Sequence, residues 1–159
     1  MSDLYFEDLR LGDKLPAFET TITQEIIDKT ALAHFDFNPL HTKPEWASRA
    51  QVLGTPLTVI HGMFTLSQMA SVITRAWGKS GAVITNMESK FVKPVPVGQT
   101  VRYEASVWES HPRHDGKSWV VISAKATDAD GDVVAVAKFN VQTPSRCQSG
   151  GTDRQETDG

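Results

Sequence analysis

The sequence predicts a single α+β domain in which a curled antiparallel sheet wraps around one long central helix. Two observations lead to this prediction. Residues 62–77 form a largely apolar run whose polar members are nearly all small and uncharged, which is typical of a helix covered on most sides. From residue 81 onward, segments rich in Val, Ile, Thr and Phe are separated by turn residues, which is typical of strands in an antiparallel sheet.

Length and composition restrict the class of protein. The chain has 159 residues, which is enough for one domain with a substantial core and too few for two domains of ordinary size. A formal net charge of −3 provides no basic surface for nucleic acid. The single cysteine, Cys147, excludes an internal disulfide framework, and the N-terminus lacks the features of a secretion signal, so we expect a cytoplasmic protein. No run reaches the ~18 apolar residues of a membrane span, so no membrane partner is expected.

The first part of the chain is expected to contain a strand and a short helix. The strand covers residues 15–21, after a turn at residues 11–13. Thr23 is a suitable N-cap for a helix that continues to about His34. The apolar residues that should share one face of this helix are Ile27, Ala31 and Leu32.

A second short helix and a turn should precede the central helix. Pro44 suits the first turn of a helix over residues 45–50, because proline needs no hydrogen bond from its nitrogen there. A turn at residues 54–56 then leads through residues 57–60 to the central helix. Met63, Phe64 and Met69 of that helix are core residues by default.

The rest of the chain predicts a sheet followed by a polar tail. Turn-forming residues separate the strand-like segments, so we expect a four-stranded antiparallel meander. The predicted strands cover residues 81–92, 99–110, 118–127 and 132–142. Residues 144–159 have hardly any apolar side chains to offset the entropy of ordering, so we expect a disordered C-terminal tail.

Two short motifs carry the candidate chemistry. The first is Asp36-Phe37-Asn38-Pro39-Leu40-His41, in which a carboxylate and an imidazole stand five positions apart. Pro39 has no N–H and pushes the preceding residue toward extended geometry, so we expect a shaped loop and no helix between them. The second motif is His61-Gly62-Met63 at the start of the central helix, where unpaired N–H groups point outward. Together the motifs predict an acid/base pair that faces an anion hole.

These motifs also carry a family resemblance. The pattern Asp-x-Asn-Pro-x-His, the later His-Gly-Met, and the Lys-Phe-Val-Lys-Pro-Val-Pro-Val-Gly segment at residues 90–98 resemble the MaoC-like (R)-specific enoyl-CoA hydratases. They are similar also to the related β-hydroxyacyl-carrier-protein dehydratase subunits. The resemblance covers roughly residues 5–143 and implies the hotdog fold. We therefore expect one MaoC-like hotdog domain over residues 1–143.

The resemblance implies reversible hydration of a trans-2-enoyl thioester, carried by CoA or acyl-carrier protein, to the (R)-3-hydroxyacyl thioester. This reaction needs groups that move a proton from water and onto C2, and a donor for the enolate oxygen. The resemblance assigns Asp36 and His41 as the catalytic dyad, Asn38 as the residue that positions them, and Gly62 as the oxyanion donor. Which member of the dyad acts first on the water stays open, because coupled groups titrate as a pair. No cofactor is expected.

Four residues near the motifs are expected to contact the substrate: His61, Met63, Pro39 and Lys93. His61 has an alternative structural role, in which its ring satisfies nearby backbone groups. CoA or a phosphopantetheine arm needs positive groups at the pocket mouth, and Lys93 is one of several candidates. The other cations considered for this role are Lys43, Arg49, Lys90 and Arg113.

The surroundings of the dyad leave further alternatives. Asp36 alone could be an ordinary turn former, but its combination with His41 and His61-Gly62 favours catalysis. His34-Phe35 stands where many relatives have a small residue and glycine, which affects the expected substrate range more than the reaction. His34, His111 and His114 are expected on the surface or in loops. His34, Asp36, His41 and His61 are a possible ligand set, but none of their spacings is specific for a metal, so no metal is expected.

Two other functions make different demands on the sequence. A thioesterase on the same fold usually has a carboxylate on the central helix, and residues 62–77 contain neither Asp nor Glu. A non-catalytic acyl-binding subunit of a heterodimeric dehydratase would have a degenerate dyad, whereas both members are present here. A curled sheet leaves an open edge, so we expect a homodimer, with a heterodimer with a sister subunit as the alternative.

Overall fold

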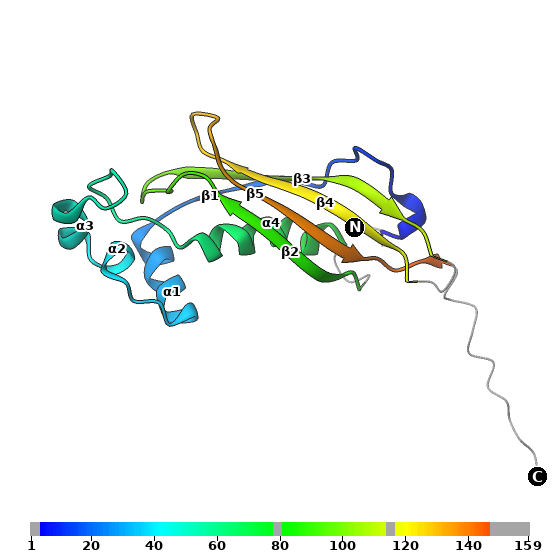
Figure 1. Cartoon of the computed structure of the whole chain (residues 1–159), viewed down its shortest axis with the longest axis horizontal. Helices are drawn as coiled ribbons and strands as arrows, with labels where there is room; N and C mark the ends of the chain where they lie inside the picture. Colours follow the sequence, from blue (N-terminus) through cyan, green and yellow to red (C-terminus); the bar gives the residue numbers. More distant parts are fainter. Residues whose placement is uncertain (1–3, 78–80, 114–116, 147–159) are drawn as a thin grey trace, which may run out of the picture.

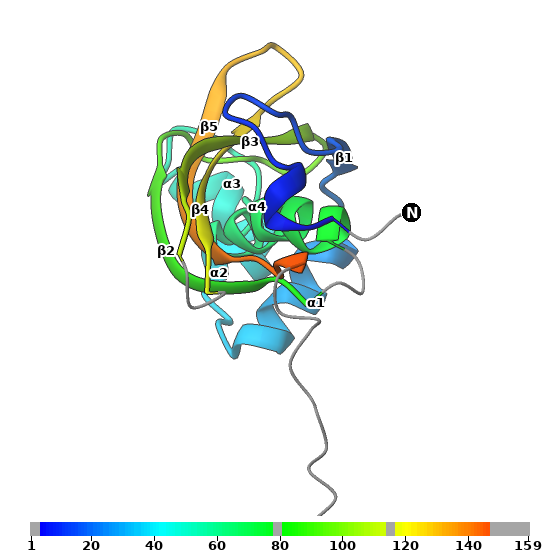
Figure 2. The ribbon, with the colours of Figure 1, turned by 90° about the vertical axis from the view of Figure 1, so that its right-hand side faces the viewer.

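The computed structural model describes residues 4–77, 81–113 and 117–146. A five-stranded antiparallel sheet curls around the long helix α4, which confirms the expected fold class (Figures 1 and 2). The elements in chain order are η1 (Phe6–Asp8), β1 (Phe18–Thr21), α1 (Gln24–His34), α2 (Pro39–Thr42), α3 (Pro44–Ala50), α4 (Gly62–Trp77), β2 (Val83–Phe91), β3 (Thr100–His111), β4 (Trp119–Thr127) and β5 (Val133–Gln142).

The strand order corrects the prediction of a four-stranded meander. The sheet has the order β1-β3-β4-β5-β2, so only β3, β4 and β5 form a meander and β2 pairs with β5. The physical reason lies in the proline-rich connector between β2 and β3, residues 92–99. Its backbone pairs with the chain that precedes α4, through Ile60 N to Val95 O (2.9 Å) and Val97 N to Thr58 O (2.8 Å). The connector therefore passes the N-terminal end of α4 and does not form a tight hairpin between β2 and β3. Strand β1 pairs with β3 instead.

Helix α4 forms the centre of the core, as the sequence predicts. Met69, Val72 and Ile73 are at most 1% exposed and belong to one cluster with side chains from the inner face of the sheet. Met63 differs from the expectation, because it is 54% exposed at the start of the helix. Among the described residues, no helix is long and apolar enough to cross a membrane.

Replacing Ile73 by alanine should lower the free energy of unfolding by about 2–5 kcal/mol, because the truncation leaves a cavity beneath a closely packed sheet. Urea denaturation measures the loss. Thr74→Ala on the same helix is the control, since Thr74 is exposed and its replacement should change stability by no more than about 0.5 kcal/mol. Equal effects of the two changes would contradict the central position of α4.

Helices α1, α2 and α3 form a separate group at one end of the sheet, beside the start of α4 (Figure 1). The expected N-cap of α1 is confirmed, because the Thr23 hydroxyl accepts a hydrogen bond from Ile26 N (3.2 Å). Ile27 and Ala31 are buried as predicted, whereas Leu32 is 62% exposed and does not share their face of the helix.

The described beginning of the expected tail packs on the N-terminal turn η1. Phe6 N donates to Pro144 O (2.8 Å), and the Arg146 guanidinium donates to the Asp8 carboxylate (2.8 Å). The remainder of the expected disordered tail, residues 147–159, lies outside the described residues, as does His114. The disorder of this tail stays a prediction.

Candidate active site

The end of α1 positions Asp36. Phe35 adopts a left-handed conformation (φ 54°), and the Asp36 N–H donates back to Ala31 O (3.0 Å), so the chain leaves the helix in a sharp turn. Glycine is the usual residue at this position, because a side chain makes the left-handed conformation unfavourable. The Phe35 side chain is 83% exposed, and the Asp36 side chain is 53% exposed. This strained turn presents the Asp36 carboxylate at the surface.

The segment between Asp36 and His41 is partly helical, which corrects the expectation of a loop. Pro39 begins the four-residue helix α2, because the first turn of a helix requires no N–H from proline. Asn38 caps this helix, its Oδ1 accepting from Leu40 N (3.1 Å), while its own backbone N–H donates to Asp36 Oδ1 (3.3 Å). The backbone of Asn38 thus contacts the Asp36 carboxylate, and the side chain of Asn38 caps the helix that carries His41.

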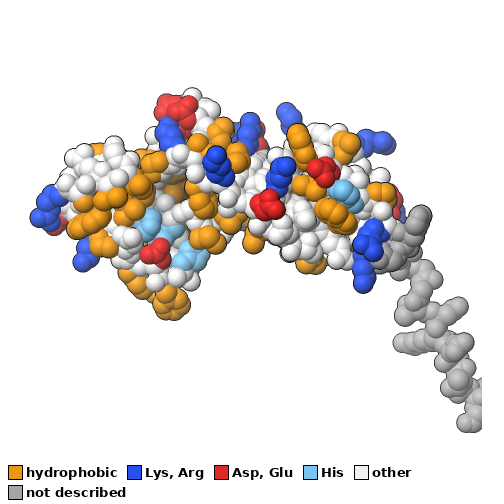
Figure 3. All heavy atoms as spheres, in the orientation of Figure 1, with side chains coloured by type: hydrophobic (Ala, Val, Ile, Leu, Met, Phe, Trp, Pro, Cys, Tyr) orange, Lys and Arg blue, Asp and Glu red, His pale blue; other side chains and the backbone are white. Residues whose placement is uncertain are grey.

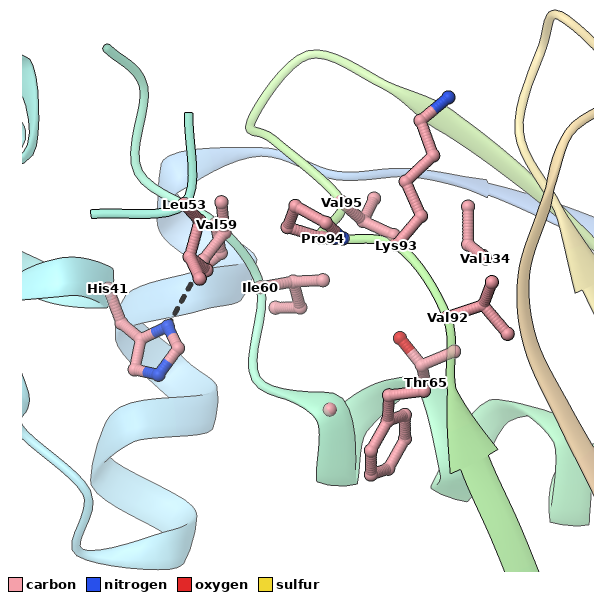
Figure 4. A pocket seen from close by; sticks show the side chains of 12 residues that line it. His41, Leu53, Val59, Ile60, Thr65, Val92, Lys93, Pro94, Val95 and Val134 are labelled. Atoms are coloured by element: carbon pink, nitrogen blue, oxygen red, sulfur yellow. Dashed lines mark hydrogen bonds between the residues drawn. The ribbon is translucent and has the colours of Figure 1, made fainter. Parts of the chain in front are cut away.

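The ring of His41 is fixed by a carbonyl group. Its Nδ1 lies 2.7 Å from Val59 O, and because a carbonyl only accepts, Nδ1 carries the proton and Nε2 is the acceptor in the neutral ring (Figure 4). The backbone of His41 is held by Gln24, whose amide donates to His41 O (3.0 Å) and accepts from the buried hydroxyl of Thr58 (2.6 Å). Sequence reasoning missed Gln24, which carries no signal beyond its place at the start of α1.

His61 is buried beneath Asp36 and His41. Its side chain is 3% exposed, its ring stacks on that of His41 with centroids 3.7 Å apart, and its Nε2 lies 3.0 Å from Asp36 O. Burial lowers the pKa of His61, although the hydrogen bond to the Asp36 carbonyl acts in the opposite direction. Figure 3 shows histidine side chains beside a carboxylate over the α1 and α2 region.

The amide of Gly62 lies at the start of α4 and has no hydrogen-bond acceptor among the described residues. A methyl group on Gly62 would meet the ring of Phe91 at 3.1 Å, so only glycine fits here without displacement of that ring. The amide at the N-terminus of a helix favours negative charge in front of it.

A mostly apolar cavity of about 310 Å³ lies between α4, the connector after β2 and the segment before α4 (Figure 4). His41 and Gly62 both border it, so the imidazole and the amide share one space. The other residues that line the cavity are Leu53, Val59, Ile60, Thr65, Phe91, Val92, Lys93, Pro94, Val95 and Val134. Sequence reasoning missed the lining by Leu53, Thr65 and Phe91; only Phe91 belonged to a motif that could have suggested it.

The predicted substrate-binding residues do not all border this cavity. Lys93 does, but its ammonium group lies 2.8 Å from both the Asp128 and the Asp132 carboxylates, which raise the pKa of Lys93. Pro39, Met63 and His61 are not among the lining residues. A role of these four side chains in substrate binding therefore stays a prediction.

Asp36, His41 and His61 come close enough together to be considered as metal ligands. One ligand atom from each lies within 4.8 Å of the others. However, Nδ1 of His41 and Nε2 of His61 already face backbone carbonyls, which leaves each imidazole one nitrogen for other partners. His34 is farther away, with its ring centroid 6.2 Å from that of His61. The expectation that the site needs no metal stays a prediction.

Comparison with known proteins identifies a family. Residues 10–129 match the family described as the MaoC like domain. The chain is 29% identical to an (R)-specific enoyl-CoA hydratase of Rhodospirillum rubrum over 142 residues, which cover 89% of this chain and 93% of the relative.

Two solved structures are similar in fold. The R-hydratase PhaJ1 from Pseudomonas aeruginosa superposes with a TM-score of 0.80 at 20% identity, covering 90% of this chain and 87% of that one. The (R)-hydratase from A. caviae involved in PHA biosynthesis gives a TM-score of 0.76 at 22% identity, covering 87% and 99%. The expected hotdog fold is thereby confirmed.

Proposed function

The chain belongs to the family of MaoC-like domains, and on this premise we propose that it catalyses the reversible hydration of a trans-2-enoyl thioester to the (R)-3-hydroxyacyl thioester. The observation that carries the proposal is the placement of His41 and Gly62 on one mostly apolar cavity, where the Gly62 amide has no acceptor among the described residues. A carboxylate oxygen of Asp36 lies within 4.8 Å of a ring nitrogen of His41. The activity of the R. rubrum relative supports the same reaction.

The geometry suits each step of this reaction. His41 Nε2 and the Asp36 carboxylate together hold a water molecule and remove its proton as the water oxygen bonds to C3. The electrons of the C2–C3 double bond move onto the thioester oxygen, where the Gly62 N–H stabilises the enolate. The enolate then collapses as C2 accepts a proton from the dyad. The hydrogen bond from Nδ1 of His41 to Val59 O favours the tautomer in which Nε2 is able to accept a proton.

The proposal is tested with a panel of trans-2-enoyl-CoA substrates that begins with crotonyl-CoA. Loss of the absorbance of the conjugated enoyl group, formation of the (R)-3-hydroxyacyl product and no release of free thiol are the expected results. Thiol release would indicate a thioesterase. No reaction with any chain length, on CoA or on acyl-carrier protein, would contradict catalysis and favour a non-catalytic acyl-binding subunit.

We also propose that the protein acts as a homodimer. Strand β2 lies at an edge of the sheet and carries apolar side chains that are about half exposed: Val83 (55%), Met87 (52%) and Phe91 (48%). A second copy that pairs with this edge would cover them. Met87→Lys should therefore shift the mass measured by light scattering from dimer to monomer.

The control for this experiment is Trp108→Lys, which removes an exposed apolar residue (58%) from β3, a strand that β4 and β5 separate from β2. This variant should remain dimeric. A wild-type protein that is monomeric by itself would contradict the homodimer and favour pairing with a sister subunit.

A further inference from the structure

We infer that His61 is a positioning residue of the dyad, which acts through a hydrogen bond to the backbone of Asp36 and through stacking on His41. The inference builds on the proposed function. It assigns His61 a role different from substrate contact, because the residues that line the cavity include His41 and Gly62 but not His61.

The contacts of His61 define its protonation. A carbonyl oxygen only accepts, so the Nε2 atom that lies 3.0 Å from Asp36 O must carry a proton. The other nitrogen, Nδ1, is buried and has no hydrogen-bond partner among the described residues. A proton on Nδ1 would be a buried donor without an acceptor, which is unfavourable. The ring is therefore neutral, with its single proton on Nε2.

This hydrogen bond completes the fixation of Asp36. The Asp36 N–H donates to Ala31 O (3.0 Å), its carbonyl accepts from His61, and its Oδ1 accepts from Asn38 N (3.3 Å). Its Oδ2 lies 3.9 Å from His61 Nε2. The contact with His61 thus holds the peptide group from which the half-exposed carboxylate projects, and it does so from the buried side.

Stacking on His61 holds the ring of His41 from one face. The centroids are 3.7 Å apart and the ring planes differ by 26°. The titratable groups that face His61 are His34, His41 and Asp36. A charge on His61 would repel the imidazolium that forms on His41 when it takes a proton, so the neutral ring supports His41 without opposing its protonation.

Two substitutions separate the contacts of His61. His61→Phe keeps an aromatic ring against His41 but removes the donor to Asp36 O. His61→Gln keeps an N–H donor at a similar reach but removes the ring. If the hydrogen bond positions Asp36, His61→Phe should lower kcat about 10²-fold with KM changed less than about twofold, because a small misplacement of a reacting group has effects of this size. His61→Gln should lose less kcat than His61→Phe, and its remaining loss measures the contribution of stacking on His41.

Two results would overturn the inference: a wild-type kcat in His61→Phe, or a loss confined to KM. Circular dichroism and urea denaturation of each variant show whether it is folded.

A measurement on the wild-type protein is independent of its activity. Two-dimensional 15N NMR of the histidine rings should show His61 as the neutral Nε2–H tautomer throughout about pH 5.5–8, where an ordinary histidine titrates. Protonation of His61 in this range, or a proton on Nδ1 in the neutral ring, would overturn the inference. A correct tautomer in a protein without hydratase activity would instead contradict the proposed function alone.

Discussion

Asp36→Ala and His41→Ala are each expected to lower kcat by about 10²–10⁴-fold, the range that general acid/base groups contribute. Asp36 is about half exposed and His41 lies in the short surface helix α2, so neither change opens a cavity in the core. Both variants should therefore keep the wild-type circular dichroism spectrum. Initial rates with an enoyl-CoA substrate measure the effect.

Two controls make the interpretation of these variants specific. Asp36→Asn keeps the size of the side chain and removes its charge, so it should be as impaired as Asp36→Ala if the carboxylate shares the proton. His111→Ala removes a histidine at the end of β3 that pairs with Trp119, far from α2, and should leave kcat unchanged. A near-wild-type rate in either dyad variant would show that the dyad is wrongly assigned.

Gly62→Pro is expected to lower kcat about 10²–10³-fold, because it removes the N–H proposed to stabilise the enolate oxygen. Proline is tolerated at the first position of a helix, so α4 should remain intact. Gly62→Ala provides the comparison, since it adds a side chain and keeps the N–H. The difference in kcat between the two variants isolates the contribution of the amide.

Steric crowding must be separated from the loss of the amide. A Cβ on Gly62 would lie 3.1 Å from the Phe91 ring, so both substitutions crowd the same contact. Combining each with Phe91→Leu gives space to the added atoms. In this background the alanine variant should recover and the proline variant should not. Equal rates of the two double variants would exclude the Gly62 amide as the oxyanion donor.

The sequence predicted the elements whose signals are local. Helix α4 has the expected bounds, because its apolar residues and flanking glycine leave little choice, and α1 begins at the predicted cap Thr23. The later strands lie within two residues of their predicted limits, since turn residues separate them. The family resemblance placed Asp36, His41 and Gly62 in one site, and these residues lie close to one another or on one cavity.

Other features depend on contacts between distant parts of the chain, which local patterns do not contain. The pairing of β2 with β5 results from the course of the proline-rich connector. Met63 is exposed although it belongs to the apolar run of α4, because burial at the start of the helix depends on how the rest of the chain packs there. Pro39 disfavours the interior of a helix but suits its first turn, and the sequence alone does not decide between the two. In the structure Asn38 caps a helix that begins at Pro39. The support from Gln24 requires knowing that α1 and α2 are neighbours.

The residues proposed for catalysis, Asp36, His41 and Gly62, all belong to one continuous stretch of the chain, together with His61 beneath them. On the proposed assignment, each copy of the chain therefore carries the whole catalytic set, while later residues such as Phe91 and Val134 only line the cavity beside it. Gene duplication and fusion would pass on two complete centres. In such a fused chain, one catalytic set can be lost while the other keeps its activity.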